Sequence, residues 1–113
     1  MAHDIVWNLE YHHKRDLGVA RYRNDAYYNK NVDSYSEEAE WTFGLSWLAI
    51  IYKNFGDNEK ALYYMNRAIE TKTEEGTIPE LYYSHSKKPN DNNPLGWSES
   101  MYIVALSKLK DVL

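Results

Sequence analysis

Residues 40–73 read EWTFGLSWLAIIYKNFGDNEKALYYMNRAIETKT and predict two helices in immediate succession. The first, residues 40–55, carries apolar side chains at helical spacing on more than one face. One stripe is formed by Trp41, Leu45, Leu48, Tyr52 and Phe55, and a second face carries Phe43, Trp47 and Ile50. A helix that is apolar on all sides is expected to be buried on all sides.

The second helix, residues 58–73, is apolar on one side only. Its apolar face carries Ala61, Leu62, Met65, Ala68 and Ile69, and its polar face carries Asn66, Arg67, Glu70 and Lys72. We therefore expect this helix to face solvent. Between the two helices, Gly56 suits a helix C-terminus and Asp57 suits the next N-cap, which predicts a tight helical hairpin.

The remaining chain predicts two further helices and two long loops. Residues 3–16 have one apolar face and end before Gly18, residues 97–112 are apolar nearly all round, and Gly76 ends the helix 58–73. Residues 18–40 and 76–97 contain many turn residues and keep no regular period. No strand is predicted, because the strand-like run YIVAL (102–106) fits a helix better in its setting. The order of buried helix, exposed helix, loop and buried helix predicts an all-α fold of about four helices in two concentric layers, a partial toroid.

Length and composition restrict the possible functions. At 113 residues the chain, 1–113, is a single domain, and its net charge of −4 gives no reason to expect nucleic acid or an anionic membrane as a partner. We find no transmembrane run, no signal peptide and no cysteine, which favours a cytoplasmic protein. Eleven Tyr, four Trp and two Phe are an unusual share, and such rings serve in cores, at interfaces and against sugars.

One interpretation starts from the helical hairpin. The pattern Leu48-Ala49-x2-Tyr52-x8-Ala61-x3-Met65-x2-Ala68 resembles one tetratricopeptide repeat. Its small residues would let two antiparallel helices approach closely. A repeat array needs about three copies to bury its faces, and the sequence holds no second copy. A helical module for protein–protein interaction therefore stands as the alternative function.

A second interpretation starts from the loops. The segments GVARYRNDAYY (18–28), IPELYY (78–83) and NPLGWSES (93–100), with the helix EWTFGLSWLAIIYKNFGD between them, resemble the same segments in glycoside hydrolase family 15, the glucoamylase-like enzymes. The resemblance extends from Gly18 to Leu109. It implies the C-terminal part of an (α/α)6 barrel, in which about twelve inner and outer helices alternate.

The resemblance also implies a reaction and a site. Glu80 matches the general base that activates water for inverting hydrolysis of a terminal α-glucosidic bond. Trp97 would line or anchor the pocket, and Arg21, Tyr22 and Tyr82 would contact the α-linked glucoside oligosaccharide. Taken without the resemblance, Glu80 is an ordinary loop carboxylate.

Two departures from the family pattern stand out. Leu81 replaces the usual Gln, and an extra polar run, SKKPNDNN, occupies residues 86–93. The segment that carries the general acid is not recognised, and none of the other candidate carboxylates (Asp25, Asp33, Glu37, Glu38 and Glu99) lies in an acid motif. We therefore expect this chain to be inactive alone, and to self-associate or to require the N-terminal part of the barrel.

No metal or cofactor is predicted. His12 and His13 are adjacent, so on a helix they point about 100° apart. A zinc ligand one turn later would fall at Asp16 or Leu17.

Overall fold

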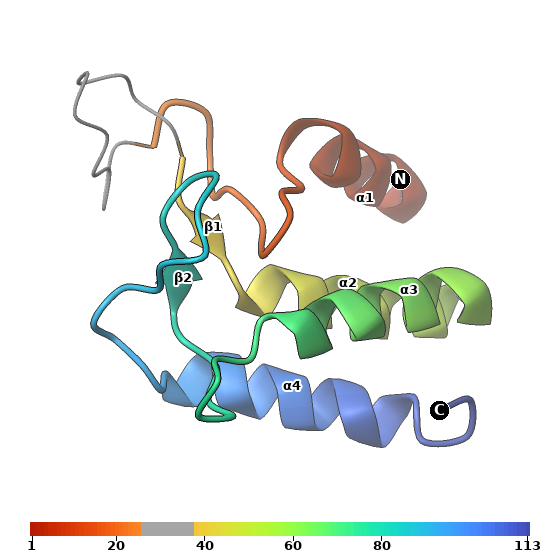
Figure 1. Ribbon diagram of the computed structural model, residues 1–113. Helices are drawn as coiled ribbons and strands as arrows, with labels where there is room; N and C mark the ends of the chain where they lie inside the picture. The colour runs from red at the N-terminus through yellow and green to blue at the C-terminus, as the bar shows by residue number, and fades with distance from the viewer. Residues whose placement is uncertain (26–37) are drawn as a thin grey trace.

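The structure, a computed structural model, describes residues 1–25 and 38–113. These residues form four helices, namely α1 (Ala2–His12), α2 (Phe43–Phe55), α3 (Asn58–Glu70) and α4 (Gly96–Lys108). They also contain a two-stranded antiparallel sheet of β1 (Glu40–Trp41) and β2 (Leu81–Tyr82) (Figure 1). The prediction of a mainly helical chain is confirmed. No helix in the described ranges is long and apolar enough to cross a membrane.

The hairpin of α2 and α3 forms as its sequence predicts. Gly56 ends α2 with φ +83°, a backbone conformation that glycine adopts without strain. The Asp57 carboxylate accepts a hydrogen bond from the Lys60 backbone N–H at 3.0 Å and so caps α3. The three small side chains of the hairpin are fully buried between the helices, which allows their close packing: Ala49, Ala61 and Ala68.

Helix α2 occupies the centre of the helical layer. It packs against both α3 and α4, which touch each other only slightly. The main core gathers around it and includes Leu45, Leu48, Tyr64, Met65, Tyr102 and Leu109. The arrangement therefore places one helix between two others, with the corner made by β1 and β2 at one end (Figure 1).

The expectation that α2 and α4 are buried on all sides is wrong. Trp47 of α2 is 49% exposed, and on α4 the exposed fractions are 54% for Trp97 and 62% for Ile103. On α4, the face that does not meet the core remains open to solvent. On α2, Ile50 and Ile51 are partly buried against the core, and Trp47 is the large apolar side chain that is exposed. The all-round apolar pattern therefore marks a second surface that remains open to solvent.

The expectation of a chain without strands is also wrong. Glu40 pairs with Tyr82 and Trp41 pairs with Leu81, which fastens the segment before α2 to the loop before α4. Val19 adds a further bridge to Trp41. These pairs are too short to leave a period of two in the sequence, so they could not be recognised from it.

The first, third and fourth helices end earlier than predicted, the fourth at Lys108, and the second begins later, at Phe43. Helix α1 ends at His12, because the following residues turn back and the Ala20 N–H donates to the carbonyl of His13 at 2.8 Å. A side chain at Gly18 would place its Cβ 2.5 Å from the carbonyl oxygen of Trp41, so this crossing requires glycine. Helix α3 ends at Glu70, and Gly76, with φ +81°, lies in the turn that follows.

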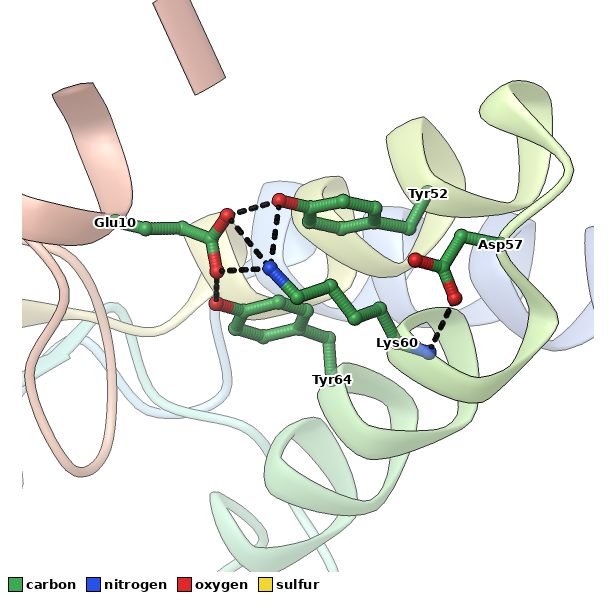
Figure 2. Close-up of polar contacts among 5 residues, drawn as sticks. All are labelled: Glu10, Tyr52, Asp57, Lys60 and Tyr64. Atoms are coloured by element: carbon green, nitrogen blue, oxygen red, sulfur yellow. Dashed lines mark hydrogen bonds and ion pairs between the residues drawn. The ribbon is translucent and has the colours of Figure 1, made fainter. Parts of the chain in front are cut away.

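Helix α1 is held to the hairpin by a polar cluster of Glu10, Tyr52, Lys60 and Tyr64 (Figure 2). The hydroxyls of Tyr52 and Tyr64 donate to the two carboxylate oxygens of Glu10, and Lys60 Nζ lies 3.3 Å from each of these oxygens. Burial disfavours the charged form of Glu10, but the bonds from Tyr52, Tyr64 and Lys60 outweigh it and lower the pKa of this carboxyl. Burial, followed by the bond to Glu10, raises the pKa of the Tyr64 hydroxyl.

Candidate functional site

The backbone of Glu80 is fixed at the end of the molecule where α2 and α4 both begin. Its carbonyl oxygen accepts a hydrogen bond from the backbone N–H of Thr42, the N-cap residue of α2, at 3.2 Å. The hydroxyl of Thr42 donates to the carbonyl of Pro79 at 2.6 Å and lies 3.0 Å from Ser98 Oγ in the first turn of α4. Thr42 and Ser98 are both buried, so this contact joins the two helix ends to the Pro79–Glu80 segment.

The carboxylate of Glu80 is held through one of its two oxygens. Asn90 Nδ2 donates to Glu80 Oε1 at 2.8 Å, and Asn92 Nδ2 donates to the same oxygen at 3.0 Å. Within residues 1–25 and 38–113, no donor reaches the other oxygen, Oε2. The half-buried carboxylate therefore keeps one oxygen that can accept a proton or a hydrogen bond.

An aromatic cluster lies at the same ends of α2 and α4. The rings of Phe43 and Trp97 stack with centroids 4.3 Å apart, and Trp47 lies 6.0 Å from Phe43. Trp97 and Trp47 are about half exposed. These rings present a flat apolar surface to solvent, with the indole N–H groups as polar edges.

Arg21 reaches this cluster from the segment that follows α1. Its guanidinium binds both carboxylate oxygens of the buried Asp25, at 2.7 and 3.0 Å, and lies 4.2 Å from the ring centroid of Trp41. Trp41 in turn contacts Phe43 edge to face. Arg21, Phe43 and Trp47 line one apolar cavity of about 280 Å³. Arg21 is therefore a fixed charge at the border of the aromatic cluster.

Tyr22 and Tyr82 occupy different environments. Tyr22 is 54% exposed and lies beside Arg21, so its ring is open to a ligand. Tyr82 is buried, and its hydroxyl donates to the carbonyl of Thr71 at 2.8 Å. Burial raises the pKa of Tyr82. In this structure Tyr82 secures β2 against the end of α3.

The residues proposed from the sequence thus fall into two groups. Glu80, Trp97 and Arg21 are linked through the segment Trp41–Phe43, which contacts all three. Tyr22 lies beside Arg21 in this group. Tyr82 stands apart, because it is buried and its hydroxyl is bonded to Thr71 at the end of α3. Asp33 and Glu37 lie outside the described residues.

Glu40 is a buried carboxylate that the sequence did not single out. It is 3% exposed, and it accepts backbone hydrogen bonds from Leu17 at 2.9 Å and from His85 at 3.0 Å. Glu40 therefore joins the segment after α1, at Leu17, to the loop after β2, at His85. No local pattern marks it, because its partners lie 23 and 45 residues away.

The other described candidate carboxylates each hold a different group. Asp25 binds Arg21, Glu38 lies 3.6 Å from Arg15, and Glu99 accepts a hydrogen bond from the Ile78 N–H at 2.8 Å. None of them is shown in contact with Glu80. The described residues therefore supply one candidate base and no recognisable acid partner for it.

A cavity of about 710 Å³ lies away from this site, between the turn after α3 and residues 87–93. Its lining includes Glu70, Lys72 and Tyr82 but not Glu80, Trp97 or Arg21. It is a broad surface hollow bordered by exposed charges. We therefore locate the candidate site by its chemistry, at Glu80, and not by volume.

Comparisons with known proteins do not identify the chain. No protein-family model matches it, and no curated protein matches it significantly. In the residues that the structure describes, no group of His, Asp and Glu side chains is arranged to hold a metal ion. The functional hypothesis therefore depends on Glu80 and the residues around it. A carboxylate with one fixed and one open oxygen can act as a base toward water.

Proposed function

We propose that this chain carries the general-base part of a glucoamylase-like, inverting glycoside hydrolase that acts on α-linked glucosides. The observation that carries the proposal is the Glu80 carboxylate, which Asn90 and Asn92 hold through Oε1. The backbone carbonyl of Glu80 is bonded to Thr42, the residue before the Phe43 ring that stacks on Trp97. The open oxygen Oε2 would take a proton from the water that attacks the anomeric carbon. The aromatic rings would pack against the apolar face of a glucose unit.

The packing of the helices supports a partial (α/α)6 barrel. Helix α2 lies against both α3 and α4, as expected for two inner helices with an outer helix behind one of them. The exposed apolar side chains of α2 and α4 would be covered by the other inner helices of a complete barrel. Trp47, Ile103 and Val104 are such side chains. On this proposal, the remaining part of the barrel is the partner of this surface.

An inverting enzyme also needs a general acid, at a carboxyl separation of roughly 6.5–9.5 Å. A substrate with a leaving group that needs no protonation tests the base by itself. We would use α-glucosyl fluoride: the water oxygen bonds to C1, the C–F bond breaks, fluoride leaves, and Glu80 takes the proton from water. The expected product is β-glucose, which NMR distinguishes from the α-anomer.

The proposal predicts that hydrolysis depends on Glu80. Glu80→Gln should lower the rate of fluoride release by roughly hundredfold to ten-thousandfold, the usual contribution of a general base. Glu75→Gln, which removes an exposed carboxylate before the same loop, is the matched control and should retain the rate. Addition of maltooligosaccharide should shift the indole N–H signal of Trp97. Equal rates for the two variants, or no release by the folded parent chain, would refute the proposal.

A second candidate is a helical module that binds another protein through the α2–α3 hairpin. The close packing at Ala49, Ala61 and Ala68 favours it, because these positions carry the resemblance to a tetratricopeptide repeat. Tyr63 and Ile69 are exposed on α3. If this candidate is correct, addition of sugar should leave every indole N–H signal unchanged. Glu80→Gln should then have no effect on the rate of fluoride release.

A further inference from the structure

The extra polar run at residues 86–93 folds back on the segment that contains Glu80. The Tyr83 N–H donates to the Lys88 carbonyl at 3.0 Å, and the Glu80 N–H donates to the Asn92 carbonyl at 2.9 Å. Between them, the Asn90 N–H donates to the Leu81 carbonyl at 3.2 Å. The loop is therefore an irregular hairpin, and its return segment brings Asn90 and Asn92 beside Glu80.

The two asparagines act on the same atom. Both amide nitrogens donate to Glu80 Oε1, at 2.8 and 3.0 Å. Each amide must present its NH₂ group to the carboxylate, because the opposite orientation would bring two acceptors together. Two donors on one oxygen restrict rotation of the carboxylate and leave Oε2 as the accepting atom.

Asn90 shows an additional feature at this contact. It is 3% exposed, and its Oδ1 has no hydrogen-bond partner in the described part of the chain. A buried acceptor without a partner is unfavourable and calls for an explanation. The contact with Glu80 supplies one, because it determines which way the Asn90 amide must face.

We propose that Asn90 and Asn92 are positioning residues that hold Glu80 as a base with Oε2 directed to the attacking water. This inference rests on the proposed function. It gives the polar run, which the family pattern does not contain, a role in the reaction. The competing explanation is that the two amides only stabilise the hairpin.

The kinetic test uses the exposed member of the pair. Asn92→Ala should lower kcat for α-glucosyl fluoride about tenfold, which corresponds to the loss of one hydrogen bond to a charged group, while KM stays within about twofold. Asp91→Asn changes an exposed neighbour in the same segment and should leave both constants unchanged. If hydrolysis requires Glu80 but Asn92→Ala keeps kcat within about twofold, the inference is wrong.

A second measurement does not depend on turnover. The side-chain NH₂ signals of Asn90 and Asn92 should move in the NMR spectrum when Glu80 is changed to Ala, and should not move in Glu75→Gln. Failure of these signals to respond would overturn the positioning contact itself. A clear response in a chain that releases no fluoride would show that the contact exists and that the proposed function is wrong, and the positioning role would be rejected with it.

Discussion

The attachment of α1 can be tested through Glu10. We expect Glu10→Ala to release α1 from the hairpin, because the cluster in Figure 2 would lose its acceptor. Tyr64 is 1% exposed, so its hydroxyl would be left buried without its partner. Other contacts of α1 include the burial of Val6, the packing of Leu9 against the core and the stacking of His3 on Phe55, with ring centroids 3.9 Å apart.

The size of the effect follows from the contacts. A hydrogen bond to a charged group contributes about 1.5–3 kcal/mol, and Glu10 accepts one from each of two tyrosines. Lys60 is 48% exposed, so its ion pair adds less than about 1 kcal/mol. Because α1 can move and admit water, we expect a total loss of about 3 kcal/mol for Glu10→Ala. Glu10→Gln should lose about half as much, since its amide oxygen still accepts one bond.

Hydrogen exchange of the backbone amides in α1 is the most direct assay. A loss of about 3 kcal/mol corresponds to an opening equilibrium, and an exchange rate, roughly a hundredfold higher in Glu10→Ala. Glu75→Ala, at an exposed loop position, is the control, and urea unfolding separates local opening from global unfolding. Exchange in α1 that is no faster in Glu10→Ala than in the control would show that the cluster does not hold this helix.

Three further outcomes follow from the same structure. The cluster lowers the pKa of the Glu10 carboxyl, so its contribution to the free energy of unfolding is present above the ordinary Glu pKa of about 4.3 and is lost as pH falls through the lowered pKa. In a series of urea titrations, the difference between the parent chain and Glu10→Gln should therefore shrink steadily as pH falls below about 4. A difference that stays constant would contradict this. The pKa of Tyr64 is raised by burial and then by Glu10, so stability should fall as pH rises above about 10. Tyr64→Phe should reduce that fall in a thermal unfolding series, and an equal fall in the parent chain and the variant would contradict this. A Cβ at Gly44 would overlap the side chain of Val19, so Gly44→Ala should destabilise the chain by about 1–3 kcal/mol. Gly96→Ala, whose Cβ meets nothing within 4 Å, should not. Equal melting temperatures for the two variants would show that the contact relaxes freely.

The local features of the fold could be predicted from the sequence. Helical periodicity located α2, α3 and α4, and Gly56 and Asp57 marked the turn between α2 and α3. These signals are legible because they depend on residues three or four positions apart, or on the backbone preference of one residue. The packing of the hairpin at Ala49, Ala61 and Ala68 follows from the same spacing.

The candidate site could be predicted only in part. The segments IPELYY and NPLGWSES drew attention to Glu80 and Trp97, and the structure places both at the end where α2 and α4 begin. The partners of Glu80 were missed, because the asparagines were interpreted only as part of a polar loop. Their contact with the carboxylate depends on the irregular hairpin of residues 80–92, whose pairs are too few to produce an alternating pattern.

The helices, the hairpin turn and the abundance of aromatic side chains could be predicted without a structure, because each of these is a property of neighbouring residues or of composition. Tertiary structure decided what each polar group binds. Glu10 meets Tyr64 across 54 residues, Glu40 meets the His85 N–H across 45, and Thr42 meets Ser98 across 56. Such pairs form because buried polar groups require partners, and that requirement can be met by any segment that the folded chain brings near. Local pattern therefore predicts where a helix lies, and only the assembled fold shows how Glu80 is held.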